Sequence, residues 1–101
     1  MHARVTRLRI RPGKLEEFVT AFDSIIPTIQ KQAGFRALLV LRNPTAAPEA
    51  TVVSAWDSLE ELRASEQNMF LFQALARILS YCEGFPVTEE HELLVGDFAV
   101  R

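Results

Sequence analysis

Residues 35–42, FRALLVLR, predict a β-strand that is apolar on both of its faces. One face carries Phe35, Ala37, Leu39 and Leu41, and the other carries Arg36, Leu38, Val40 and Arg42. A sheet covered by a single layer of helices would leave one of these apolar faces in water. A chain of 101 residues is too short to supply a second layer. We therefore expect a second copy of the chain to cover the other face, so that the protein is a homodimer paired through its sheet.

The stretch 51–66, TVVSAWDSLEELRASE, predicts a strand that leads directly into a helix. Residues 51–56 are rich in β-branched side chains and end in an aromatic one, which suits a strand. Ser58, followed three residues later by Glu61, predicts a capping box at the start of a short helix over 59–66. Trp56, at the end of the strand, could form the wall of a pocket or pack in the core against that helix.

The remaining elements follow from periodicity and chain breakers. We expect a strand over 3–11, carrying arginines on a solvated or salt-bridged face, and a last strand over 91–100. Because Val5 and Leu8 fall on opposite faces, the first strand has either a bulge or two partly covered faces. An amphipathic helix is expected from Leu15 to Ala33-Gly34, with a kink at Pro27. A second long helix is expected over 69–82, capped by Asn68.

This order of elements (strand, helix, strand, strand, short helix, helix, strand) predicts the fold class. Antiparallel strands with helices on one face give an α+β, ferredoxin-like sandwich built on a four-stranded sheet. The whole chain, residues 1–101, is expected to be one domain. Residues 43–50, NPTAAPEA, connect the second and third strands, which we expect to form an antiparallel hairpin.

Composition excludes several classes of function. The net charge is −2, and the arginines near the N-terminus are balanced by acids elsewhere and are not interleaved with aromatics, so a nucleic-acid partner is not expected. No apolar run is long enough to span a membrane. A single cysteine, Cys82, excludes an intrachain disulfide and is typical of the cytoplasm. The sequence has no phosphate loop, CxxC, HExxH or GxSxG motif, and we expect no cofactor and no metal.

Three segments resemble a known family. RPGKLEEFVTAF, AGFRALLVLRNP and VVSAWDSLEELRAS are similar to the antibiotic biosynthesis monooxygenase superfamily, and the resemblance extends over essentially the whole chain. It implies a dimeric α+β barrel. Members of the superfamily include cofactor-independent monooxygenases that act on polycyclic aromatic quinols, quinol monooxygenases and heme-degrading enzymes.

The sequence departs from the family's patterns at the positions that carry chemistry. Nine residues after the strand-end tryptophan, where a histidine is common, the chain has Ser65. The heme-degrading pattern requires an asparagine, a tryptophan and a histidine where this chain has Thr6, Ser65 and Leu75, so heme degradation is not expected. The polyketide-type pattern has an asparagine at the position of Val52. Trp56 is the residue of that pattern that remains.

The candidate pocket residues are individually weak signals. Each also has a plainer structural interpretation, as core, surface or ion-pair residue: Trp56, Phe70, Phe72, Tyr81, Arg36, His91 and Ser65. Arg36 could anchor an anion, but we favour an ion pair across the dimer. His91 is more simply a rim histidine than a base. If the first and last strands pair antiparallel, His2 and His91 should lie at opposite ends of the sheet, which disfavours a shared metal.

Two functions from different classes remain. One is a cofactor-independent monooxygenase that oxidises a small aromatic or quinol-type substrate with dioxygen. The other is a non-catalytic dimer that binds a small molecule or has a structural role. An enzyme pocket should hold a buried polar group near Trp56, whereas a binding or structural module could line it with carbon alone. A third possibility is a collapsed cavity filled by Trp56 and Phe70.

Overall fold

The structure is a computed structural model that describes residues 1–45 and 48–98. Its elements are four strands, β1 (His2–Ile10), β2 (Phe35–Arg42), β3 (Glu49–Trp56) and β4 (Cys82–Glu92), and three helices, α1 (Leu15–Ile29), α2 (Leu59–Ser65) and α3 (Met69–Leu79). The order of elements confirms the predicted α+β, ferredoxin-like fold.

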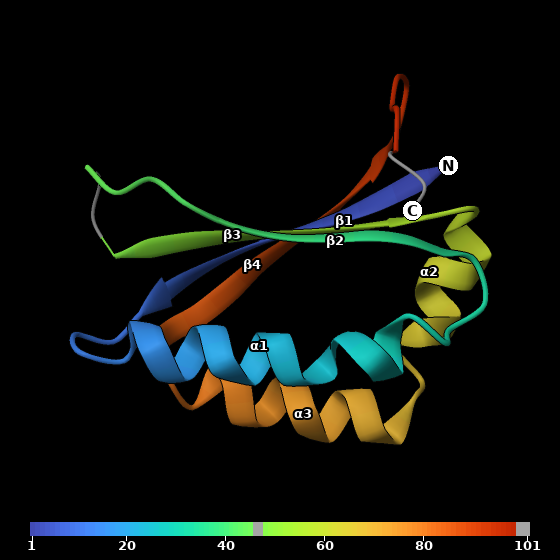
Figure 1. The fold of residues 1–101 in the computed structure, drawn as a ribbon. Helices are drawn as coiled ribbons and strands as arrows, with labels where there is room; N and C mark the ends of the chain where they lie inside the picture. The colour runs from blue at the N-terminus through green and yellow to red at the C-terminus, as the bar shows by residue number, and fades with distance from the viewer. Residues whose placement is uncertain (46–47, 99–101) are drawn as a thin grey trace.

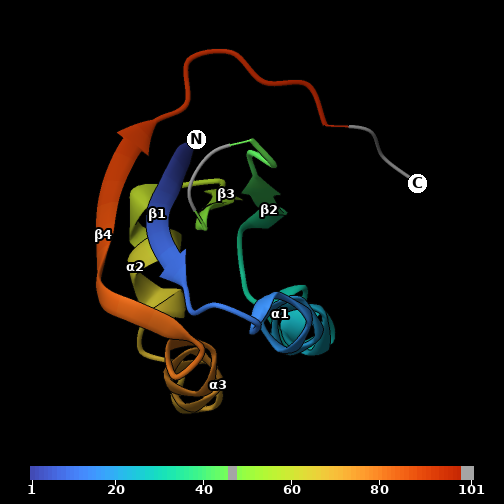
Figure 2. The same cartoon turned by 90° about the vertical axis from the view of Figure 1, so that its left-hand side faces the viewer.

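The four strands form one antiparallel sheet in the order β2-β3-β1-β4. Helices α1 and α3 lie side by side beneath this sheet, and α2 closes one end of the space between the layers (Figure 1). The view along the strands shows no helix on the opposite face among residues 1–45 and 48–98 (Figure 2). We call these two surfaces the covered face and the open face.

The core lies between the covered face and the helices. The largest fully buried side chains are Trp56, Phe18, Leu62 and Ile78. Leu8 and Ile10 of β1 join them, since alternate residues of a strand point to one side. Phe18 and Phe22 of α1 pack edge to face, with ring centroids 5.1 Å apart. Burial of this apolar stripe of α1 is what holds the helix on the sheet.

The N-terminal caps of helices α2 and α3 were predicted correctly. The Ser58 hydroxyl accepts a hydrogen bond from the Glu61 backbone N–H at 3.1 Å and lies 3.0 Å from the Glu61 carboxylate. The Asn68 side chain accepts one from the Leu71 N–H at 3.0 Å. Each cap satisfies a backbone donor that has no partner inside its helix. These caps fix where α2 and α3 begin.

The prediction for the C-terminal third of the chain was wrong. The expected helix over 69–82 ends at Leu79, and the last strand is Cys82–Glu92, not 91–100. An acidic strand is stable here because its neighbour β1 is rich in arginine; Arg7, for example, forms an ion pair with Glu89 at 3.1 Å. Because β4 is an edge strand, Gly84 and Pro86 are tolerated within it.

Three further details differ from or refine the predictions. Helix α1 ends at Ile29, earlier than the expected Ala33-Gly34, and turns lead from there to Gly34, which has a φ of +79°. A register shift near the start of β2 places Phe35 against Trp56, on the covered face together with Leu38 rather than opposite it. Strand β1 has both an irregularity and two partly covered faces, the two alternatives predicted for it. Its pairing with β4 shifts register between Arg7 and Arg9. Val5 is partly buried on one face, and Leu8 is buried on the other.

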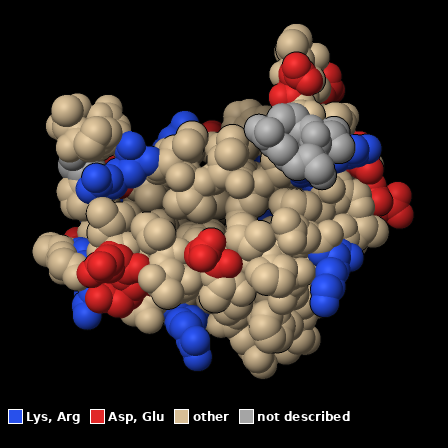
Figure 3. All heavy atoms as spheres, viewed as in Figure 1, with Lys and Arg blue, Asp and Glu red and all other residues tan. Residues whose placement is uncertain are grey.

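Charged residues are interspersed over the surface. Basic and acidic side chains alternate with uncharged ones on the side shown in Figure 3, without a continuous basic patch. Within residues 1–45 and 48–98, no helix is both long and apolar enough to cross a membrane.

Candidate functional site

A cavity of about 500 Å³ lies between the covered face and the helices. Most of its wall is carbon, contributed by α1, α3 and the middle of the sheet. The apolar lining residues are Leu8, Phe22, Ile25, Ile29, Leu38, Val52, Leu71, Phe72, Leu75, Ile78, Leu79 and Pro86. A cavity of this size and character suits a small, largely apolar ligand. The possibility that the fold survives with its cavity filled is therefore wrong for this structure.

The mouth of the cavity lies between α3 and β4. Lining residues that are exposed to solvent lie on both sides of it: Phe72, Leu75 and Leu79 on α3, and Pro86 and Thr88 on β4. Glu66 and Gln67, between α2 and α3, are exposed lining residues at one end. Phe22 and Val52, on the opposite wall, are buried. A ligand would therefore enter between α3 and the edge strand and reach toward β3 and α1.

Two serine hydroxyls form the buried polar part of the wall. Ser54 and Ser65 are both almost fully buried. The Ser54 hydroxyl accepts a hydrogen bond from Trp56 Nε1 at 3.0 Å, and among the described residues its own proton has no acceptor. The Ser65 hydroxyl donates to the Leu62 carbonyl at 2.6 Å, which leaves its oxygen able to accept. The pair could thus donate to a ligand at one point and accept from it at another.

Arg4 and Glu66 are the charged members of the described lining. Arg4 Nη2 lies 2.9 Å from Glu66 Oε1 and donates to the Leu62 carbonyl at 3.3 Å. The pair joins β1 to the chain just after α2. Two further polar residues, Thr6 and Thr88, face each other across β1 and β4 with their hydroxyls 3.1 Å apart.

Trp56 lies behind the cavity wall. Its side chain is 0% exposed and packs with Ile29, Leu62 and Leu71. The ring of Phe35 meets it edge to face at a centroid distance of 5.5 Å. Trp56 is not among the described lining residues, and it reaches the cavity through its hydrogen bond to Ser54.

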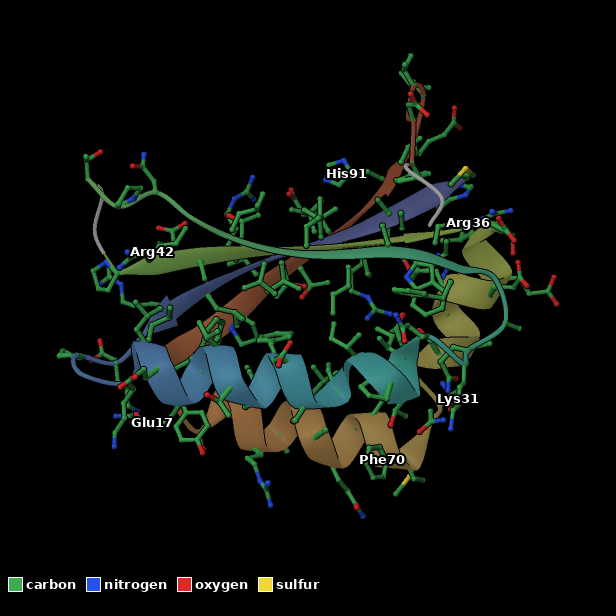
Figure 4. The ribbon with its side chains drawn as sticks, in the orientation of Figure 1. Glu17, Lys31, Arg36, Arg42, Phe70 and His91 are labelled. Atoms are coloured by element: carbon green, nitrogen blue, oxygen red, sulfur yellow. The ribbon has the colours of Figure 1, made fainter. Side chains whose placement is uncertain are left out.

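Of the other predicted pocket residues, the structure brings two to the cavity. Ser65 lines the buried wall, and Phe72 lines the mouth. Phe70 lies apart, at the outer groove between α1 and α3, and is labelled in the helix layer of Figure 4. Tyr81 is half-buried against the core between α3 and β4.

Arg36 and His91 lie away from the cavity (Figure 4). Arg36 forms an ion pair with Asp57 of the same chain, at the end of β3. His91 is on the open face, with its Nε2 atom 3.5 Å from Glu89 Oε1. The hydrogen bond from Arg7 and, to a smaller extent, the one from His91 lower the pKa of the Glu89 carboxyl.

The predicted separation of the two histidines was wrong. His2 pairs with Glu92 and Ala3 pairs with His91, so both histidines lie at the same end of the sheet, on opposite faces. The error follows from the misplaced last strand. Within the described residues, no group of three or more potential ligand side chains is placed to hold a metal ion.

Cys82 belongs to the core next to the site. Its thiol donates to the Ile78 carbonyl at 3.6 Å, and burial raises its pKa. A thiol that stays protonated is a poor nucleophile. Cys82 therefore has the properties of a core residue.

Sequence reasoning missed Arg4 and Ser54. Arg4 is one of four arginines in a short segment, and these were interpreted together as a solvated or salt-bridged face. A usable signal was present, because Arg4 shares its strand face with Leu8 and Ile10, both buried. Ser54 is two residues before Trp56 and so shares its face in the same way.

Comparison with solved structures supports the fold. A candidate antibiotic biosynthesis monooxygenase from Caulobacter crescentus has a TM-score of 0.83 and 20% identity, with 93% of this chain and 90% of that chain covered. A candidate antibiotic biosynthesis monooxygenase from Bordetella bronchiseptica has a TM-score of 0.82 and 13% identity, with 93% of this chain and 97% of that chain covered. A Nitrosomonas europaea protein of unknown function has a TM-score of 0.81 and 19% identity, covering 99% and 95%.

Sequence comparison identifies the family. No curated protein matches the chain. The sequence model of the antibiotic biosynthesis monooxygenase family matches residues 1–77, which include β1, α1, β2, β3, α2 and most of α3. These elements supply most of the cavity wall described above. On this match over most of its length, the chain belongs to the antibiotic biosynthesis monooxygenase family.

Proposed function

We propose that this protein is a cofactor-independent monooxygenase that oxidises a small aromatic, quinol-type substrate with dioxygen in the cavity beneath its sheet. The observation that carries the proposal is the Ser54 hydroxyl, which is buried in a mostly carbon wall and hydrogen-bonded to Trp56. A few fixed polar groups in an apolar cavity orient a flat ligand. Family membership supports the reaction class.

The chemistry needs an electron-rich substrate that acts as its own reductant. An anthrone, for example, reacts with one dioxygen molecule to give an anthraquinone and one water molecule, so one oxygen atom enters the product and the other leaves as water. The ionised substrate is the form that gives up an electron to dioxygen most readily. In this proposal the Ser54 hydroxyl donates to the ionised oxygen of the substrate, and the Ser65 oxygen accepts from a remaining substrate hydroxyl. The apolar wall shields the substrate from water.

We further propose that the active protein is a homodimer paired through the open face. Leu39 of β2, Val53 of β3 and Val5 of β1 are direct neighbours across the sheet and form one apolar row. Leu41 and Val87 extend this apolar area and are more than half exposed. Burying such a row against its copy would remove it from water on both chains.

A non-catalytic, ligand-binding dimer is the second candidate. It is favoured by the lack of an evident base, because the described lining contains no histidine and its carboxylate, Glu66, is held by Arg4. A binding protein needs the cavity but no proton acceptor. The two candidates therefore differ in turnover rather than in ligand.

Oxygen uptake distinguishes the two. Purified protein would be given a panel of naphthoquinols and anthrones, with Leu75→Trp as a variant that fills the cavity. Phe70→Trp is the matched control, on the same helix but outside the cavity. We expect the wild-type protein to consume oxygen above the spontaneous rate. This rate should fall in Leu75→Trp and in Trp56→Phe, which loses the hydrogen bond to Ser54. It should be unchanged in Phe70→Trp. A wild-type rate equal to the spontaneous rate throughout would favour the binding protein.

A further inference from the structure

The cavity contains one cation that is held more firmly than its counterion. The Arg4 side chain is 19% exposed, whereas that of Glu66 is 47% exposed. Glu66 follows the last residue of α2 and could turn into solvent at little cost, since an exposed carboxylate is well hydrated. Arg4, on the central strand β1, could not leave as easily.

Arg4 has donors to spare. Both of its described contacts, to Glu66 and to the Leu62 carbonyl, use Nη2. The N–H groups on Nε and Nη1 have no acceptor among residues 1–45 and 48–98, and a guanidinium presents its donors in a planar fork that suits two oxygens at once. The neighbour of Arg4 on β4, Glu90, is already bound twice by Arg63, at 3.2 and 3.0 Å.

Polarity changes along the cavity. Arg4 is directly opposite Ser54 in the pairing of β1 with β3. A guanidinium group and a hydroxyl group are therefore neighbours at one end of the cavity. Leu8 lies four residues further along the same face, about 13 Å away at the usual rise of a strand. Ile78 and Val52 belong to the same buried cluster as Leu8. The cavity is therefore amphiphilic, with its charge at one end.

We propose that Arg4 is a ligand-binding residue and that the natural ligand carries an anionic oxygen, a carboxylate or an ionised phenol, on an aromatic or otherwise apolar body. The anionic oxygen binds Arg4 and the Ser54 hydroxyl, and the apolar body extends toward Leu8. Glu66 gives up its contact with Arg4 when the ligand binds. This inference rests on the proposal that the cavity is the ligand site, and it narrows the substrate to the ionised form.

Calorimetric titration with matched probes tests the proposal without turnover. 2-Naphthoate and a naphthol ionised at the working pH supply the two kinds of anionic oxygen, and 2-naphthamide and 2-methylnaphthalene are the neutral counterparts. We expect each anion to bind about tenfold or more tightly than the neutral probes. If only one of the two anions binds more tightly than the neutral probes, the result shows whether the natural ligand carries a carboxylate or an ionised phenol. Neutral probes that bind as tightly as both anions would overturn the role of Arg4 while leaving the cavity proposal intact.

Variants separate binding from a purely structural role of the pair. Arg4→Gln should weaken 2-naphthoate binding about tenfold or more and change 2-naphthamide binding less than about twofold, and Arg4→Lys should restore part of the loss. Arg9→Gln, which removes an arginine of the same strand on the open face, is the matched control and should leave both affinities unchanged.

Glu66→Gln gives the sharpest result, and it covers the case in which Arg4 variants fail to fold. If Glu66 competes with the ligand for Arg4, its neutralisation should tighten 2-naphthoate binding about three- to tenfold and leave 2-naphthamide binding unchanged. If the pair only fastens β1 to α2, Glu66→Gln should weaken both probes alike, and that result would overturn the proposal. Failure of every probe to bind the wild type would overturn the cavity proposal as well.

Discussion

The covered face and the open face of the sheet are made from similar residues but differ in what lies against them. On the covered face, Leu8 and Val52 pack against the helices and border the cavity. On the open face, Leu39 and Leu41 are 52% and 51% exposed. In the described part of the chain, no helix lies on this face of the sheet (Figure 1). The covered face builds the core and encloses the cavity. In our proposal, the open face pairs with a second copy.

The largest effect is expected from a core residue of the covered face. Phe18→Ala removes a side chain that is almost fully buried against the sheet. We expect the free energy of unfolding to fall by about 3–5 kcal/mol, the usual cost of an emptied aromatic site. Urea denaturation measures it. A loss below about 1 kcal/mol would mean that the helix layer is not packed on the sheet as described.

A charge on the open face should act on assembly rather than on the fold. We expect Leu39→Arg to raise the dissociation constant of the dimer about a hundredfold or more, because each of two symmetric copies contributes the change. Sedimentation velocity over a range of concentrations measures it. Val19→Arg is the matched control, since Val19 is similarly exposed, at 51%, but lies on α1. Equal behaviour of the two variants would contradict pairing through the open face.

The ion pair at the end of β3 should contribute less to stability than the covered face and less to dimerisation than the open face. Arg36 binds Asp57 within its own chain, and the Arg36 side chain is about half exposed. We expect Arg36→Gln to lower the free energy of unfolding by less than about 1 kcal/mol and to leave the dimer intact. A dimer that dissociates in this variant would show that Arg36 acts across the interface after all.

The smallest effect concerns pH and the acidic edge strand. The hydrogen bonds from Arg63 lower the pKa of the Glu90 carboxyl below its ordinary value of 4.5. A carboxyl with a lowered folded-state pKa stabilises the fold above 4.5 and loses that contribution as the pH falls through the lowered value. We expect Arg63→Gln to lower the Tm slightly at pH 7 and by less at pH 2. An equal difference at both pH values would rule out this linkage.

The sequence predicted the fold where local signals and burial agree. The strand 35–42 was placed correctly because its apolar run lies between Gly34 and Asn43-Pro44. Strand β4 was missed because it is acidic and exposed; it is a strand through its pairing with the arginines of β1, which no local pattern shows.

The site was harder to predict than the fold because it depends on register. Ser65 was expected in the pocket and does line the cavity. Arg4 enters the cavity because its register places it opposite Ser54, whereas Arg7 and Arg9 lie on the open face. Alternation along the strand separates Arg4 from Arg7 and Arg9, but only the pairing of strands shows that Arg4 lies opposite Ser54.

A crystal structure of the protein with 2-naphthol bound, at a pH at which this ligand is ionised, would test the division between the two faces most directly. We expect the naphthol between the sheet and helices α1 and α3, with its oxygen near Arg4 and Ser54 and with the open faces of two copies in contact. A naphthol held on the open face, or two copies packed through their helices with Leu39 still in water, would contradict this expectation.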